Sequence, residues 1–547
     1  MNVNKQPIKA NYFIFILILM PAITYIFIIY HYAVDAPIAD DYNSVLEFLN
    51  NYNNMHQYIE KITYLFHPHN EYKLVFSNIV QVLILKTNGI MNFKYLIYIG
   101  NIGLVGIFIL FYSRFKIFNL PIIYILPVSL LLFNFSAYNM AFWPMASMQG
   151  YWQILFALLS IHFLIQNKHK YSIIFYVMTM IQGGLWVSLF PVILLHYMLK
   201  RDHKYLTVLL IITILILIIM YATGMNQPGH SILNNLKQGF HLILFSLGVL
   251  GSISNNFNIA VVFGLLIVVW YIFVLWKFKT SLLSSFSFHA MTMILISSAG
   301  LAVNRIHTGL EACLSSRYSL ISLLMISLIY MLLLEKCHQK KFVKKIFYLF
   351  LTFSLLMYIF NTRFIDKIEH RKEYLQSTFY PYFNDLFART ILKESTISKI
   401  YNRTLKYGSM KVYDVDMIDL KFKNIVSTSQ IIHNTYQINA MYNPSKNFKY
   451  VILGSYIKGD ASKANIYFSM NKNQYFLLST GPRNSGQRIS FFDMDNHFIK
   501  EELLPAMSNG WVLIKIISKD MPLNFKVQIS DNSSKWGEWN AIALEKK

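Results

Sequence analysis

Charged residues are scarce in this sequence. They make up 14% of the 547 residues, whereas a soluble domain carries about 25%, and 55% of the residues are hydrophobic. This composition excludes a soluble enzyme for most of the chain. Acidic residues are especially few: the chain has 26 acidic and 49 basic residues, which gives a net charge of +23. No basic and aromatic nucleic-acid module is visible, so we expect no nucleic-acid partner and place the bases relative to a membrane.

The sequence also lacks a set of paired cysteines. Its two cysteines, Cys313 and Cys337, flank a hydrophobic segment long enough to separate them by a bilayer, so no disulfide is expected. The apolar run that ends near Tyr30 lacks the small-residue cleavage site of a signal peptide and is nearly long enough to span a membrane. It is therefore predicted to be an uncleaved first helix.

Long apolar runs dominate the first two thirds of the chain. A spanning helix needs about 20 predominantly apolar residues, and eleven spans are predicted. They lie near residues 11–32, 93–113, 118–136, 151–166, 171–183, 185–199, 205–222, 257–276, 285–303, 318–334 and 345–361. The sequence GGLW at 183–186 divides one apolar stretch into two short halves. The run 236–253 is a further candidate, either a span or a re-entrant or interfacial segment.

Basic residues predict the orientation of these spans. Of the 23 Lys and Arg before residue 362, 16 fall in the segments placed inside, as the positive-inside rule requires. With a cytoplasmic N-terminus and an odd number of spans, everything after about residue 361 lies outside the cytoplasm.

The composition changes along the chain. Residues 1–361 are predicted to form the membrane domain, with a first outer loop at 33–92, and residues 362–446 to form connecting helices. Over 447–547, short β-like runs alternate with turn residues, which indicates an extracytoplasmic β-sandwich. The predicted fold class is an α-helical polytopic membrane protein with a C-terminal β-sandwich domain.

Acidic residues of the membrane domain concentrate in the first outer loop. Six of the nine acids before residue 362 lie between Asp35 and Glu71, and they include the adjacent pair Asp40 and Asp41. Two carboxylates beside a membrane cavity can supply a general base or a metal ligand. They can also cap the helix that the following SVLEFLNNY predicts, for which Asp41 has the better position.

The same loop contains the sequence HPHNEYK at 67–73. His67, His69 and Glu71 offer ligands for a divalent metal, although two His and one carboxylate are a weak metal signal. Recognition of a substrate headgroup or hydroxyl groups by these side chains and Asn70 is the preferred interpretation, and a plain loop contact is the alternative. We therefore expect no cofactor.

A second polar cluster follows the span at 285–303. The sequence NRIHTGLEACLSSRYS places Arg305, His307, Glu311 and Arg317 at the membrane surface, where a buried charge needs a partner. The planar fork of an arginine suits a phosphate group. Pairing of Glu311 with either arginine, or extension of both arginine side chains to the interface, are the alternatives. Trp143, Gln149, Trp152 and Trp186 are expected in the interfacial aromatic belt, with a sugar-binding role as the alternative.

With these residues laid out, the chain resembles polytopic GT-C fold glycosyltransferases of the bacterial envelope that use a polyprenyl-phosphate-linked sugar. Their first outer loop carries an acidic motif, matched in this chain by Asp40 and Asp41. The chain is also similar to a group of these proteins with an HNEH motif, which reads HNEY at 69–72 with Tyr72 in place of the second His. The other shared patterns are Arg305, Gly309 and Ser316-Arg317-Tyr318, and, more loosely, Asp531, Ser533, Gly537 and Trp539.

The resemblance implies an enzyme of the bacterial cytoplasmic membrane. Asp40 and Asp41 would be catalytic, Arg305 and Arg317 would bind the donor phosphate, and His67, His69, Asn70, Glu71, His307, Glu311 and Tyr318 would support the substrate. The implied partners are the lipid-linked donor, a glycan or lipid-linked glycan acceptor, and membrane lipid. A transporter or flippase of lipid-linked sugars, and an O-antigen polymerase or ligase, are the alternatives; transporters usually place charges within spans and contain inverted repeats.

Overall fold

The computed structural model describes most of the membrane domain and most of the C-terminal β-strands. The described residues are 8–38, 40–89, 91–224, 235–337, 339–369, 371–372, 375, and 450–545 without 455–463, 473–474, 481–482, 484–485, 505–511, 516–520, 534 and 536–537. The chain divides into two compact units. The helical unit comprises Met1–Ala33, Asn51–Ile84 and Phe93–Lys367, and the second unit comprises Val34–Asn50, Leu85–Asn92 and Ile368–Lys547.

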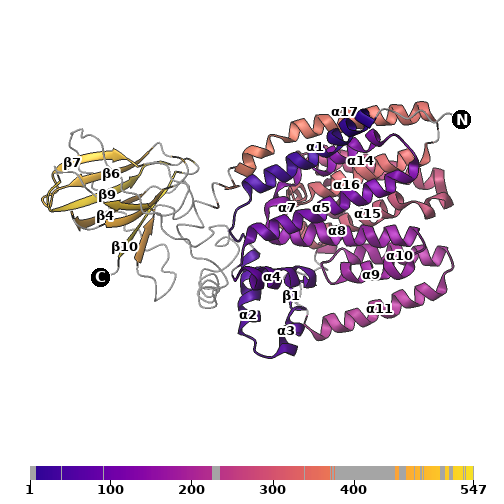
Figure 1. The fold of residues 1–547 in the computed structure, drawn as a ribbon, viewed down its shortest axis with the longest axis horizontal. Helices are drawn as coiled ribbons and strands as arrows, with labels where there is room; N and C mark the ends of the chain where they lie inside the picture. Colours follow the sequence, from indigo (N-terminus) through magenta and orange to yellow (C-terminus); the bar gives the residue numbers. More distant parts are fainter. Residues whose placement is uncertain are drawn as a thin grey trace. The chain divides into compact units, whose positions relative to one another are not determined.

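Long apolar helices build the helical unit, and most of them run side by side (Figure 1). They are α1 (Ile8–Tyr32), α5 (Phe93–Phe115), α8 (Pro144–Ile165), α11 (His203–Ala222), α14 (Phe257–Phe278), α15 (Phe286–Arg305), α16 (Ser319–Lys336) and α17 (Lys340–Asn361). Together with the helical stretch Ile122–Phe142, they make nine candidate membrane spans within the described residues. This confirms the prediction of a largely helical protein with many membrane-compatible helices.

The two predicted spans at 171–183 and 185–199 form short helices. They correspond to α9 (His169–Met180, 12 residues) and α10 (Trp186–Leu199, 14 residues), which are about 18 and 21 Å long at 1.5 Å per residue. The run 236–253 contains the 11-residue helix α13 (Phe240–Leu250). All three are too short to cross a hydrocarbon core of about 30 Å as straight helices.

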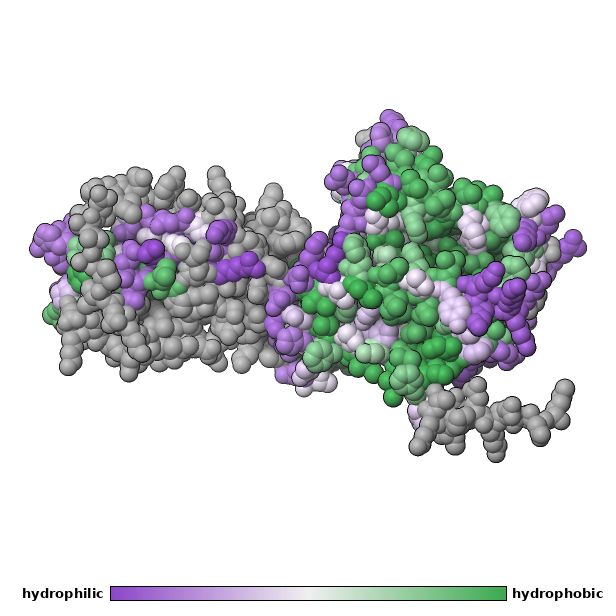
Figure 2. Space-filling view, turned by 90° about the horizontal axis from the view of Figure 1, so that it is seen from above, coloured by the Kyte–Doolittle hydropathy of each residue, from purple (hydrophilic) through white to green (hydrophobic). Residues whose placement is uncertain are grey.

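Burial differs strongly between these helices. In α16, 72% of the most apolar 18-residue stretch is buried inside the unit, whereas in α11 only 17% of that stretch is buried. The exposed side chains of α11 are large and apolar, for example Ile214 and Ile218, each 57–58% exposed. Figure 2 shows that hydrophobic residues cover the middle of the helical unit on the face that it draws. Such a surface is the one that lipid solvates, so α16 is a core helix and α11 a peripheral one.

Buried polar contacts join the helices that lie in the core. The Tyr25 hydroxyl of α1 donates to Asn101 Oδ1 of α5 over 2.9 Å and lies 3.0 Å from the Tyr151 hydroxyl of α8. α5 and α8 approach closely at Gly100, where a Cβ atom would lie 2.6 Å from Ser147 Cβ. Small residues and shared hydrogen bonds of this kind hold helices together where no water is present.

Several basic residues gather at one end of the helical unit. The Arg114 guanidinium lies 5.5 Å from the centre of the Phe286 ring, and Lys336 donates to the Ser281 carbonyl over 3.0 Å. Glu335 accepts a hydrogen bond from Ser285 Oγ over 2.8 Å and pairs with Lys336 at 3.4 Å. These contacts bring the ends of α5, α15 and α16 together with the 3₁₀ segment η5 (Lys279–Ser284) that follows α14, so the basic residues of these ends lie together, as the positive-inside pattern requires.

The C-terminal strands form two antiparallel four-stranded sheets. The strands are β3 (Tyr450–Gly454), β4 (Ala464–Asn471), β5 (Tyr475–Thr480), β6 (Gln487–Phe492), β7 (Phe498–Leu503), β8 (Val512–Lys515), β9 (Asn524–Asp531) and β10 (Asn540–Glu545). Their orders are β3-β10-β5-β8 and β4-β9-β6-β7. Side chains of both sheets share one core, in which the ring centres of Phe468 (β4) and Phe476 (β5) lie 5.1 Å apart. The predicted C-terminal β domain is thus confirmed, and the connecting region beyond residue 375 lies outside the described residues.

Candidate functional site

The two aspartates of the first loop have different environments. Asp41 is fully buried, and its Oδ2 accepts a hydrogen bond from the Ile38 backbone N–H over 2.8 Å. Asp40 is half-buried, and its carbonyl accepts from the amides of Asn43 and Ser44. Among the residues that the structure describes, no hydrogen bond or ion pair engages the Asp40 carboxylate. Asp41 therefore closes the loop, and Asp40 is the carboxylate that remains available for chemistry.

The predicted helix cap has a different form. Asp41 stands at the N-cap of the helix η1 (Tyr42–Glu47), but its side chain makes no capping hydrogen bond, because it reaches back to Ile38 instead. The capping role predicted for Asp41 is wrong in that respect. The helix itself is a π-helix, a rare form that occurs frequently at functional sites.

The HPHNEYK segment forms a tight hairpin in the helical unit. β1 (Pro68–His69) pairs with β2 (Tyr72–Lys73), and Asn70 and Glu71 form the turn. Asn70 has a φ of 51°, a left-handed conformation that Asn tolerates better than most residues. Within the described residues, His67, His69 and Glu71 do not form a three-ligand metal group.

His67 lies outside the hairpin and lines a pocket. Its ring stacks on Tyr64 with the ring centres 4.6 Å apart. The pocket has a volume of about 320 Å³ and is lined by Met55, Ile59, Glu60, Thr63, Tyr64, His67 and Thr223. Of the predicted site residues, His67 alone is among these lining residues. The pocket combines aromatic, apolar and carboxylate side chains, which suits an amphiphilic ligand or a sugar.

Lys73 is a residue that the sequence analysis did not single out. It is fully buried, and its Nζ donates to the carbonyls of Thr223, over 3.2 Å, and Gly224. These carbonyls end α11, where the helix dipole favours a positive charge. Burial nevertheless lowers the pKa of Lys73 to about 8. Lys73 thereby ties the first loop to the end of α11.

We expect the contribution of Lys73 to stability to depend on pH. Its pKa in the folded protein, about 8, is below the unfolded value, so the unfolded chain binds more protons between about pH 8 and 10.4. The free energy of unfolding should therefore rise with pH in this window, by up to about 3 kcal/mol. In detergent, the melting temperature of the parent minus that of Lys73→Met should be larger at pH 10 than at pH 7.5 (~2.5 units apart). A difference that does not change with pH would contradict this.

The arginine cluster follows the end of α15. Arg305 is the last residue of α15, and two 3₁₀ turns, η6 (Ile306–Thr308) and η7 (Leu310–Leu314), lead toward α16. Gly309 joins the turns with a φ of 99°, which only glycine adopts readily, and this explains the glycine of the Arg305–Gly309 pattern. His307 and Glu311 are exposed.

Arg317 lies against two aromatic rings. Its guanidinium carbon is 5.2 Å from the centre of the Trp143 ring and 5.8 Å from that of Tyr318. In the part of the chain that the structure describes, neither Arg305 nor Arg317 forms an ion pair, so the alternative of pairing with Glu311 is wrong there. Stacking on an aromatic ring orients a guanidinium and leaves its in-plane N–H donors for another acceptor.

Trp152, one of the residues expected in the aromatic belt, packs within the helical unit. Trp152 donates its indole N–H to the Ile99 carbonyl over 2.9 Å and packs on Phe76. Its N–H is therefore used within the unit. Trp143 differs, because it contacts Arg317, a pairing that sequence spacing alone does not reveal.

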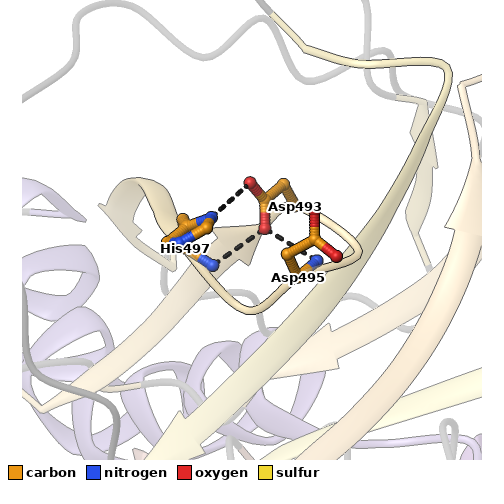
Figure 3. A group of neighbouring side chains, drawn as sticks. All are labelled: Asp493, Asp495 and His497. Carbon is orange, nitrogen blue, oxygen red and sulfur yellow. Dashed lines mark hydrogen bonds and ion pairs between the residues drawn. The ribbon is translucent and has the colours of Figure 1, made fainter.

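One further group of polar side chains lies in the β domain. Asp493, Asp495 and His497, on the β6–β7 connection, bring ligand atoms within 4.8 Å of one another (Figure 3). The Asp493 carboxylate accepts from the backbone N–H of Asp495 and from the backbone and the ring of His497, and these bonds lower its pKa. Hydrogen bonds of the turn therefore account for the group.

Asp40 and Asp41 belong to the second unit, whereas His67, Lys73, Arg305 and Arg317 belong to the helical unit. In comparisons with known proteins, no family model, no curated protein and no solved structure matches this chain.

Proposed function

We propose that this protein is a GT-C type membrane glycosyltransferase. It transfers a sugar from a polyprenyl-phosphate donor to an envelope glycan or lipid-linked glycan on the outer face of a bacterial cytoplasmic membrane. Three features support the proposal: many apolar helices long enough to cross a membrane, an acidic pair in the first loop, and two arginines, one at the end of α15 and one after it. The N-terminus is then cytoplasmic, and the β domain extracytoplasmic.

The observation that carries the proposal is that Arg317 stacks on aromatic rings and has no carboxylate partner among the described residues. Its guanidinium is held by Trp143 and Tyr318, and no carboxylate of the described residues neutralises it. A charge at a membrane surface is stabilised by an anionic partner, and a planar guanidinium fits a phosphate with two parallel hydrogen bonds. Arg305 supplies a second positive charge. Together they favour a lipid phosphate as ligand and as leaving group.

The proposed reaction is a single displacement at the sugar. The acceptor hydroxyl oxygen attacks the anomeric carbon, the bond from that carbon to the phosphate oxygen breaks, and the phosphate leaves with the electron pair. Asp40 takes the proton of the hydroxyl. Because a carboxylate near pKa 3.9 is a weak base for an alcohol, this transfer comes late, when the hydroxyl has become acidic. Arg305 and Arg317 stabilise the charge that develops on the phosphate, and a nearby carboxylate stabilises the oxocarbenium-like carbon.

The experiment that tests this function compares envelope glycans by mass spectrometry. A strain without the gene should lack a hexose-sized increment that the complemented strain regains. Glycans of identical mass in both strains would contradict the proposal. Loss of whole repeat units, instead of one sugar, would favour a polymerase, a ligase or a flippase.

We expect the β domain to be accessory to the chemistry. Removal of residues from about 447 onward should leave measurable donor hydrolysis or transfer to a small acceptor, because the acidic pair and the arginines lie before residue 362. The domain then binds or positions a polysaccharide acceptor, or covers the site. The measurement is sugar release from the donor in membranes that contain equal amounts of the two proteins. Complete loss of release, in a shortened protein that still inserts and folds, would contradict this division.

A further inference from the structure

The short helix α3 (Tyr58–Tyr64) exposes its apolar side chains. None of its residues is buried, and Tyr58, Ile59 and Ile62 are 80%, 67% and 42% exposed. Such a cluster on a loop indicates a surface that contacts another apolar phase, because scattered single residues need no explanation but adjacent ones do.

The position of α3 identifies that phase. Ile59 and Thr63 of α3 line the same pocket as Thr223, which directly follows α11. Lys73 binds the carbonyls of Thr223 and Gly224, so the loop is fixed to this end of α11 (Figure 1). α3 therefore lies where a highly apolar and mostly exposed helix of 20 residues ends, at the level of a membrane surface.

The lipid-facing surface of α11 continues toward α3. Large exposed side chains follow one another up to the end of the helix; they are Ile211, Ile214, Leu215, Ile218, Ile219 and Tyr221. Tyr221 and Tyr58 are each 80% exposed, and tyrosine prefers the boundary between headgroups and acyl chains. Next to these side chains, the Lys61 ammonium of α3 lies 5.4 Å from the centre of the Tyr52 ring, so an aromatic face stabilises this charge close to the exposed apolar residues.

We propose that α3 is an interfacial helix that inserts into the membrane surface at the C-terminal end of α11. Ile59 and Ile62 are neighbours on the helix and face the acyl chains, whereas Glu60 points away from Ile62 toward water. Because α3 forms one wall of the pocket, a ligand enters the pocket from the headgroup layer and is a membrane amphiphile. The identification of this amphiphile as the lipid-linked donor rests on the proposed function. The insertion of α3 into the membrane surface is independent of that function.

Spin labels test the insertion without any assay of activity. Cys337→Ser leaves the buried Cys313 as the remaining natural cysteine, and a nitroxide is attached to Ile59→Cys, Ile62→Cys or Glu60→Cys in liposomes of phosphatidylethanolamine and phosphatidylglycerol. Collisions with oxygen report on lipid, and collisions with a soluble nickel chelate report on water. Leu215→Cys on α11 is the control in lipid. Leu523→Cys in the β domain, at a leucine that is 61% exposed where Leu215 is 53% exposed, is the control in water.

Positions 59 and 62 should favour oxygen as position 215 does, and positions 60 and 523 should favour the nickel chelate. If positions 59 and 62 behave as position 523 does, α3 is in water and the proposal is wrong. If the label at position 59 is protected from the nickel chelate but the label at position 62 is not, the protection comes from the pocket and not from the membrane. That result also overturns the proposal. Because α3 has no buried side chain, these substitutions leave the fold intact. If the labels give the expected pattern but the envelope glycans of the strain without the gene equal those of the complemented strain, the proposed function is wrong and the interfacial helix is still supported.

Discussion

Asp40→Asn is expected to lower sugar transfer by about 10² to 10⁴ while the protein level in membranes stays normal. Asparagine keeps the size of the side chain and its hydrogen bonding, but it removes the proton acceptor and the negative charge. The Asp40 carboxylate has no partner within the described residues, so its replacement costs little stability. The measurement is the rate of sugar transfer from lipid-linked donor in isolated membranes.

Asp41→Asn is the matched control for this prediction. Its Oδ2 accepts from the Ile38 amide, and an asparagine oxygen accepts the same bond, so the buried loop should persist and transfer should fall less. If both variants retain near-parental transfer at normal protein levels, neither carboxylate is the base and the proposed displacement mechanism is wrong. If Asp41→Asn is the more damaging of the two in a folded protein, the roles of the two carboxylates are reversed.

The second large effect concerns Arg317→Lys, for which transfer should fall by about 10² to 10³. Lysine keeps the positive charge but loses the planar fork that binds two phosphate oxygens, and it stacks less well on Trp143. Transfer is measured at saturating acceptor with increasing donor, which separates donor binding from the chemical step.

Arg363→Lys is the control for loss of stacking alone. The Arg363 guanidinium lies 3.7 Å from the centre of the Phe360 ring, so this variant also exchanges a stacked arginine, at a position with no predicted phosphate role. It should retain near-parental transfer. Equal losses in the two variants would show that Arg317 acts through packing, and an Arg317→Lys protein with parental kinetics would exclude phosphate binding by a guanidinium fork at this position.

Sequence reasoning found the features that local composition determines. The long helices follow from apolar runs of 18 residues or more, and the β-strands follow from alternating apolar residues, as at Phe525, Val527 and Ile529, all of them buried. It did not settle 171–199, because apolar character measures preference for lipid and does not determine how far a helix continues beyond a Gly-Gly turn.

The candidate site was predictable only in part, because side-chain partners depend on tertiary contacts. A helix-cap pattern at Asp41 does not reveal that its carboxylate reaches back to Ile38. Lys73 and Thr223 are 150 residues apart, and Arg317 and Trp143 are also distant in the chain, so neither pairing has a local signal. Gly309 is the exception, since a glycine between two short turns is itself a signal of positive φ.

The most direct test of the proposed glycosyl transfer is cleavage of the donor. Polyprenyl-phosphate sugars are extracted from cells that lack the protein and are incubated with liposomes that contain either the parental protein or the Asp40→Asn variant, together with envelope glycan from the same cells. We expect the parental protein to release polyprenyl phosphate and to add one sugar to the glycan in equal amounts, and the variant to do neither at a comparable rate. Movement of intact donor across the bilayer, with no polyprenyl phosphate released, would contradict the proposed transfer.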